Sequence, residues 1–455
     1  MIPFLHNLEE RLSKVKSKAG IELEHRPIFF ASVTLLIVAF IFMNGPTMSA
    51  IQMALFLAPL WLPPMLVAGA WNLWKILKQS EFIAGQDMIL LEIRPPRAVL
   101  KTPLAMETVL SGLHLAPGEG TWYARLIQGK VRPWWSLEIA SIDGQVHFFI
   151  WTRKGFRRII ESQIYAQYAG AQVTEVPDYT RTISAKPGEW TIWGCDFKHT
   201  QADPIPIKTY IEYGLDKVQK EYEQVDPLAN LIEFLGSMRK GENIWVQMII
   251  RVHKGEKYGK LNGKGDVFTW KDHAQELIQG IRAQTVGKVR YKDVFTGEER
   301  ESEGFPNPTK GQSEMMAAIE RNVSKQAFDV GMRVVYLAKP EAFDPTTISG
   351  ITGLFKQFSS EGWNGLRHTG WMATFDDYPW ERNVDKRKNE MRKDLIDAYR
   401  RRQFYYEPYN SMKDAIVMST EEIATLYHIP SQAVATPTLG RVPSATGEAP
   451  ANLPI

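Results

Sequence analysis

The stretch SLEIASIDGQVHFFIWTRKGFRRIIESQIYAQYAGAQVTEV (residues 136–176) decides the fold that we expect for this chain. Its first part, residues 136–142, alternates apolar and polar side chains as a strand does, and residues 145–152 do the same. The Asp143-Gly144 pair between them is among the strongest short hairpin signals. These residues therefore predict a two-stranded antiparallel hairpin.

Further elements on both sides extend this hairpin into a larger unit. Residues 156–168 form an amphipathic helical pattern, and residues 171–176 are strand-like. Ahead of the hairpin, residues 88–94 predict a strand and residues 103–113 a helix. The order strand, helix, strand, strand, helix, strand is that of a split βαβ unit. We therefore expect a ferredoxin-like domain over residues 85–180.

A second ferredoxin-like domain is expected over residues 188–376. A polar, Lys- and Gly-rich insertion at residues 255–311, with a short helix near 273–282, opens its central hairpin. The predicted elements are strand 190–197, helix 227–238, strand 243–252, helix 313–328, strand 330–337, helix 346–358 and strand 371–375.

Two apolar runs without a charged residue, residues 28–43 and 51–74, precede these domains. A helix that spans lipid needs about 17–25 apolar residues, so the sequence predicts a two-helix transmembrane hairpin over residues 27–78, after an amino-terminal segment 1–26. Lys and Arg flank both runs and none lies in the turn, which favours cytoplasmic ends. The alternative is two buried helices of a soluble protein. The expected fold class is thus α+β: a membrane helical hairpin followed by two tandem ferredoxin-like units.

The composition argues against several kinds of chemistry. A single cysteine, Cys195, excludes a disulfide framework, and nine scattered histidines show no metal-ligand spacing. No phosphate-binding loop and no Gly-x-Ser-x-Gly elbow occurs. The net charge of +3 implies no general field for nucleic acid. We therefore expect no catalytic residue, no metal site and no cofactor.

A basic helical segment, residues 377–429, holds the candidate binding residues. Phosphate groups of nucleic acid or of anionic lipid are the ligands that such a charge run could contact. Acidic residues such as Asp394 and Asp397 offset part of the charge, so a solvated helix face is the favoured interpretation. The tail, residues 430–455, is expected to be disordered. The candidate residues are Lys386, Arg387, Lys388, Arg392, Lys393, Arg400, Arg401 and Arg402.

Two other features admit a binding role, although a structural one is favoured for both. The insertion carries lysines that could touch phosphate, and an aromatic cluster could stack on bases as RNA-recognition sheets do. A solvated loop and a sheet core are the respective alternatives. The lysines are Lys254, Lys257, Lys260 and Lys264, and the aromatic residues are Trp134, Trp135, Phe148, Phe149 and Trp151.

Three segments carry a resemblance to a known family. Residues 136–176 and DPLANLIEFLGSMRKGENIWVQMII (residues 226–250) resemble the amino-terminal region of conjugative-transfer ATPases of type IV secretion systems, in versions from candidate-phyla bacteria. The tail from Ser419 looks like the linker to their ATP-binding core. The chain ends at Ile455, where that core would begin, so we expect no ATP hydrolysis and no enzyme activity.

The resemblance implies a non-catalytic, membrane-anchored component of a type IV secretion-like or conjugation-like apparatus. Such a component would dock a separate cytoplasmic motor ATPase to the bacterial inner membrane, contact other secretion-system subunits and act as an oligomer, with most of its chain in the cytoplasm. The alternative hypothesis is a membrane-tethered module that binds DNA or anionic lipid through the basic segment.

Overall fold

The computed structural model describes most of the chain from residue 52 to residue 441. The described residues are 52–53, 55–96, 99, 101–183, 188–216, 225–292, 299–372, 384–431 and 438–441, and at residues 61, 287–292 and 299–306 only the backbone is described. The chain divides into two compact units. The first comprises Met1–Gly85, Gly120–Val131 and Phe375–Lys388, and the second comprises Gln86–Glu119, Arg132–Thr374 and Asn389–Ile455.

The first unit shows that the predicted membrane hairpin is wrong. Its long helix α4 (Ala58–Ala84) begins seven residues after the start of the predicted second span, and Pro63 and Pro64 lie inside it. In the described part of the chain, no helix combines the length and the apolar character that a membrane crossing requires. Helix α4 is less apolar than the lack of charge in residues 51–74 suggests, because it contains prolines, the polar residue Asn72 and, beyond that run, the charged residue Lys75. The predicted first span, residues 28–43, and the segment 1–26 lie outside the described residues.

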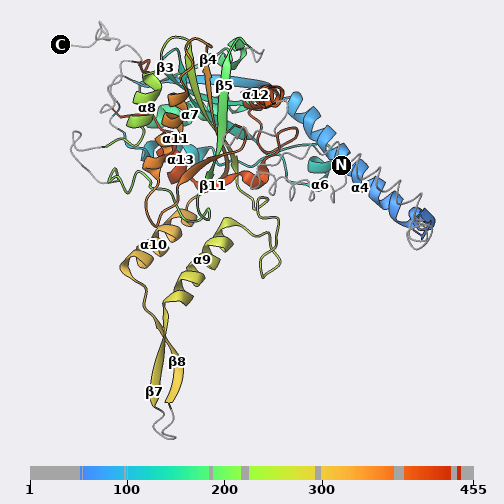
Figure 1. Cartoon of the computed structure of the whole chain (residues 1–455), viewed down its shortest axis with the longest axis vertical. Coiled ribbons are helices and arrows are strands. Elements are labelled where there is room, and N and C mark those ends of the chain that lie inside the picture. Colours follow the sequence, from blue (N-terminus) through green and yellow to red (C-terminus); the bar gives the residue numbers. More distant parts are fainter. Residues whose placement is uncertain are drawn as a thin grey trace, which may run out of the picture. The chain divides into compact units, whose positions relative to one another are not determined.

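The second unit is built on one nine-stranded antiparallel sheet (Figure 1). Its path runs β10-β5-β9-β6-β2-β3-β1-β4, and β11 pairs with β9 off this path. The strands are β1 (Met88–Arg94), β2 (Trp134–Ile142), β3 (Gln145–Arg153), β4 (Gln172–Val176), β5 (Thr191–His199), β6 (Glu242–Val252), β9 (Ala327–Ala338), β10 (Leu366–Thr369) and β11 (Ile416–Ser419).

Two groups of four strands share this sheet. The orders β2-β3-β1-β4 and β10-β5-β9-β6 are each the strand order of a split βαβ unit. Strands β2 and β6 join the groups, in register from Trp134 opposite Arg251 to Ile142 opposite Asn243. The chain is therefore α+β, and its two split βαβ units share one continuous sheet, whereas the membrane hairpin that was expected before them is not supported. Of the last predicted strand, 371–375, residues 371 and 372 form a turn after β10, which ends at Thr369, and residues 373–375 lie outside the described residues.

The main hydrophobic core lies between one face of the sheet and five helices. Alternate strand residues such as Ile244, Val246 and Met248 of β6 are buried there. The helices contribute apolar positions such as Val109 of α5 and Ile164 of α7. They are α5 (Leu104–Gly112), α7 (Arg157–Gln167), α8 (Ala229–Gly236), α11 (Pro345–Leu354) and α13 (Thr420–Leu426).

The opposite face of the sheet is covered by α12 (Val384–Arg401) from Asn389 onward and by the residues that follow it. Leu395 approaches Gly194 of β5, and Phe404 approaches Gly331 of β9. The central strands β6 and β9 are consequently buried on both faces along their whole length. The predicted aromatic cluster is part of these layers: Trp134, Trp135, Phe148, Phe149 and Trp151 are all buried.

An arm extends the connection between the adjacent strands β6 and β9. It consists of α9 (Trp270–Thr285), β7 (Val286–Lys292), β8 (Glu299–Pro306) and α10 (Lys310–Ser324). Helices α9 and α10 lie side by side, and the β7–β8 hairpin continues beyond them, away from the sheet (Figure 1). We call residues 253–269, which lead from β6 into α9, the arm root.

The carboxyl-terminal tail is described only in part. Leu439 is buried and forms an isolated bridge with Val146, whose backbone N–H donates to the carbonyl of Thr438 at 3.1 Å. Residues 432–437 and 442–455 of the tail predicted to be disordered lie outside the described residues.

Candidate functional site

The eight candidate residues of the basic segment do not share one exposed surface. They lie on α12 and directly after it, on several sides of the helix. Lys386, Lys393 and Arg401 are exposed, and Arg402 is buried. The remaining four, Arg387, Lys388, Arg392 and Arg400, are intermediate. On the exposed side, Arg401 pairs with Asp397 at 2.7 Å, so the surface carries both signs of charge.

Arg402 is fully enclosed. Its Nε lies 3.0 Å from Glu138 Oε1, and its Nη2 lies 3.0 Å from Asp178 Oδ1. Burial alone would lower the pKa of its guanidinium, but the carboxylates of Glu138 and Asp178 outweigh this and raise the pKa well above its ordinary value. Its positive charge is therefore neutralised inside the protein and is not presented to a phosphate.

Two neighbours of Arg402 also direct their guanidinium groups at the protein itself. Arg400 donates to the carbonyl of Thr180 at 3.0 Å and to that of Ile183. Arg392 donates to the carbonyl of Ile192 at 3.2 Å. These bonds fasten α12 to the loop after β4 and to β5. For this part of the segment, the structure shows a helix-docking role.

Under α12, polar side chains form a row across four neighbouring strands. Glu138 of β2 lies opposite Gln247 of β6, Gln247 opposite Arg333 of β9, and Arg333 opposite Asp196 of β5. Gln247 donates to Glu138 at 3.1 Å, and Arg333 to Asp196 at 2.8 Å. Such a row suits the binding of a charged helix such as α12, and every member is buried or nearly so.

Sequence reasoning missed this polar row, although a signal for it exists. Glu138, Gln247 and Arg333 each lie between two apolar residues within a strand. A charged or amide side chain there is costly to bury unless it has a partner. Its presence therefore points to a covering element that supplies that partner, but it does not identify the element.

The arm root is the second place where charged groups gather. Asp203, in the loop after β5, accepts from His199 Nδ1 at 3.2 Å and from Lys257 of the root. Burial raises the pKa of this carboxyl, but His199 and Lys257 outweigh burial and lower the pKa to about 2. The ion pair between Asp203 and Lys257 therefore fastens the root to the sheet at neutral pH.

An aromatic group extends this contact. The ring of Tyr258 packs edge-on against the rings of His253, Phe268 and His273, with centroids 5.9, 5.3 and 5.6 Å away. His253 Nδ1 lies 2.6 Å from Asp329 Oδ1 of β9. Tyr258 therefore bridges the sheet and the first turn of α9.

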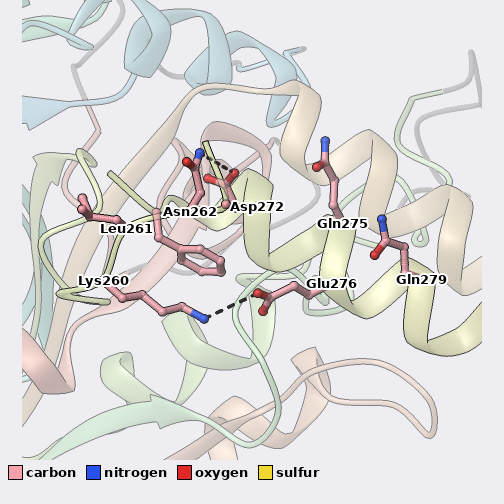
Figure 2. Close-up of a pocket in the computed structure, with 9 residues that line it drawn as sticks. Lys260, Leu261, Asn262, Asp272, Gln275, Glu276 and Gln279 are labelled. Atoms are coloured by element: carbon pink, nitrogen blue, oxygen red, sulfur yellow. Dashed lines mark hydrogen bonds and ion pairs between the residues drawn. The ribbon is translucent and has the colours of Figure 1, made fainter. Parts of the chain in front are cut away.

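A shallow groove lies beside the root, between α9 and residues 260–263 (Figure 2). Its volume is about 210 Å³. Lys260 lies 3.6 Å from Glu276, and its ammonium is 3.7 Å from the centroid of the Phe268 ring. Asn262 donates to Asp272 at 3.2 Å. Because these charges satisfy one another, the groove offers no unpaired charge to a ligand.

Among the described residues, no group of three or more His, Cys, Asp or Glu side chains is placed to hold a metal ion. Cys195 is buried, and burial raises the pKa of its thiol, so it is not activated as a nucleophile. The interactions that gather at α12 and at the arm root are charge pairs, Arg402 with Glu138 and Asp178, and Lys257 with Asp203.

These features define an α+β protein with one nine-stranded antiparallel sheet, a docked basic helix and a two-helix arm tipped by a hairpin. The chain belongs to the family described as Domain of unknown function (DUF8128), whose model matches residues 78–441. That match covers the sheet, the arm and α12. Among curated proteins, none matches this chain.

Proposed function

We propose that this protein is a non-catalytic docking component of a type IV secretion-like or conjugation-like apparatus, and that the arm binds the motor ATPase of that apparatus. The resemblance of residues 136–176 and 226–250 to proteins of such systems supports the choice of apparatus. The arm supports the docking role.

The arm is the observation that carries this proposal, because the sheet does not require it. Strands β6 and β9 pair in full register from Glu242 opposite Ala338 to Val252 opposite Phe328, so a short turn could connect them. The chain instead builds two helices and a hairpin there. Long structured insertions in compact domains are usually functional. The hairpin also forms a separate two-stranded sheet, which leaves backbone edges for a partner.

The alternative, a module that binds DNA or anionic lipid, has less support. Among the basic residues that would serve it, Arg402 is enclosed by Glu138 and Asp178, and Arg400 donates to backbone carbonyls. Arg401 is already paired with Asp397. Nucleic-acid binding that depends on these residues would have to break contacts that hold α12 in place.

Removing the tip of the arm tests the proposal. Val286 and Pro306 are opposite each other in register, so an Asn-Gly turn can replace residues 287–305 without straining α9 or α10. The probe is the purified motor ATPase encoded in the same secretion gene cluster, titrated by calorimetry. We expect binding by the wild type, a large loss of affinity in the shortened variant, and an unchanged thermal transition of the sheet.

A matched control breaks the exposed Lys310–Glu314 pair at the start of α10, where the two charges are 3.7 Å apart. The double substitution Lys310→Ser with Glu314→Ser should leave affinity unchanged. Equal affinity of the shortened variant and the wild type would overturn the docking role of the arm, as would absence of any binding by the wild type.

A further inference from the structure

The arm root brings together three histidines whose rings each have a buried nitrogen without a hydrogen-bond partner. These atoms are His199 Nε2, His253 Nε2 and His273 Nδ1. His199 and His253 come from strand ends of the sheet, whereas His273 belongs to the first turn of α9. The group therefore spans the joint between the sheet and the arm.

His273 is the member on the arm side. Its ring lies 5.6 Å from that of Tyr258 and 6.3 Å from that of Phe268. It is half-buried, and a nitrogen without a partner in such a place favours the neutral ring. Tyr258 in turn directs its hydroxyl toward Asp203 Oδ2 at 3.4 Å. The ring of Tyr258 thus connects His273 to Asp203, the carboxylate that anchors the root.

Charged groups of both signs face His273 from the elements packed against it. The root contributes the ammonium groups of Lys257 and Lys260, the loop after β5 contributes Asp203, and α9 itself contributes Glu276. Behind Tyr258 lies Asp329, which pairs with His253 at 2.6 Å and with Arg251 at 3.1 Å. His199 contacts Asp203 at 3.2 Å. Both nearby carboxylates already have a cation, Lys257 on Asp203 and Lys260 on Glu276.

We propose that the arm root is a proton-operated joint, in which protonation of His273 weakens the attachment of Lys257 and Tyr258 to Asp203 and frees the arm to move relative to the sheet. The new charge lies among rings, it is repelled by two lysines, and it competes for carboxylates that are already paired. The joint itself does not depend on the proposed docking role of the arm. Only its biological meaning rests on that role, because the joint would regulate when the arm is held rigid for a partner.

The direction of the pH effect follows from His273. Burial lowers the pKa of its imidazole below the usual value near 6.5, although Asp203 and Glu276 oppose the shift. The rigid root therefore binds fewer protons than a loosened root in which the ring meets water. Its stability is full above about pH 6.5 and is lost as the pH falls below that value.

Fluorescence energy transfer between the arm and the sheet tests the joint in the full chain without any partner. Cysteines placed at exposed Gln279 of α9 and exposed Arg158 of α7 accept the dyes, while Cys195 is buried and stays unlabelled. Between about pH 7.5 and about pH 5.5, the wild type should pass from a narrow to a broad distribution of transfer efficiencies.

The variant His273→Gln keeps a neutral polar side chain and should retain the narrow distribution at both pH values. His368→Gln, at an exposed position of β10, is the matched control and should behave like the wild type. A wild type without pH dependence, or a His273→Gln variant that broadens as the wild type does, would refute the joint. Neither result depends on the motor, so the docking role and the joint can fail separately.

Discussion

Arg402 places a guanidinium between two carboxylates where water has no access. Its side chain is 0% exposed, and that of Glu138 is also 0% exposed. Charges taken out of water lose several kcal/mol of hydration each, which only close partners restore. The Trp134 indole N–H also donates to the Arg402 carbonyl at 3.0 Å. This one residue therefore fixes the end of α12 against β2.

The substitution Arg402→Met should destabilise the protein strongly. Methionine fills a similar volume, so the main effect is to leave Glu138 and Asp178 without a cation. Breaking a buried pair in this way costs about 3–5 kcal/mol in the free energy of unfolding. Urea denaturation followed by tryptophan fluorescence measures this change.

Its neighbour on the exposed side supplies the control. Arg401 pairs with Asp397 in solvent, so Arg401→Met should cost at most about 1 kcal/mol. Adding Glu138→Gln to Arg402→Met should recover part of the loss, because one uncompensated charge disappears. A cost below about 1 kcal/mol for Arg402→Met would show that the enclosed pair does not hold α12.

At the scale of elements, two glycines in the strands make room for α12 and for the segment after it. A Cβ at Gly331 of β9 would lie 2.3 Å from Phe404 Cγ, and one at Gly194 of β5 would lie 2.6 Å from Leu395 Cδ2. Phe404 is itself buried, so its ring has little room to move. The close approach of α12 and of the segment after it therefore requires glycine at positions 194 and 331.

Gly331→Ala should lower the free energy of unfolding by about 1–3 kcal/mol through overpacking. Gly280→Ala in α9 is the matched substitution, because nothing lies within 4 Å of the added methyl group. Alanine is the better helix former by about 1 kcal/mol, so this change should stabilise the arm or have no effect. Chemical denaturation of both variants gives the comparison, and an unaffected Gly331→Ala protein would contradict the tight packing of Phe404.

At the scale of the whole molecule, the sheet is one cooperative structure. The β2–β6 pairing joins strands separated by about a hundred residues, and Gln247 and Arg402 supply the partners of Glu138 from beyond the first group of strands. Without the rest of the second unit, β2 would expose its backbone edge, and Glu138 would lose two of its partners, Gln247 and Arg402. The first four strands therefore depend on the rest of the second unit.

Two separate chains, residues 1–185 and 186–455, test this dependence. We expect residues 1–185 alone to lack a defined tertiary structure, as judged by near-ultraviolet circular dichroism, and to regain it when co-expressed with residues 186–455. The break lies in the connection between β4 and β5, so it removes no strand. A sharp tertiary spectrum from residues 1–185 alone would show that the first group of strands folds independently.

Much of the local structure follows directly from the sequence. The period-two alternation over residues 136–152 indicates two strands, and the Asp143-Gly144 turn has the positive φ angles, 51° and 83°, that its sequence favours. The helical patterns of α7 and α9 are equally local. Such patterns depend on neighbours two to four positions away, so one sequence is enough to detect them.

The surface or interior position of the basic segment could not be predicted in the same way. The run that contains Lys386, Lys393 and Arg402 has one composition, yet its first members are exposed and its last is enclosed. The difference arises from Glu138 and Asp178, which lie more than two hundred residues away. The arm root is similar, because Asp203, Tyr258 and His273 come from three separate segments.

By itself, the sequence determined the local elements that carry a clear period, such as the hairpin of residues 136–152 and the helix α7 that follows it. Only the tertiary structure decided that two strand groups share one sheet and that α12 closes its polar face. The physical reason is that unpaired strand edges expose the same backbone groups in every sequence. Which edge meets which, and which buried charge meets its partner, depends on packing between residues far apart in the chain.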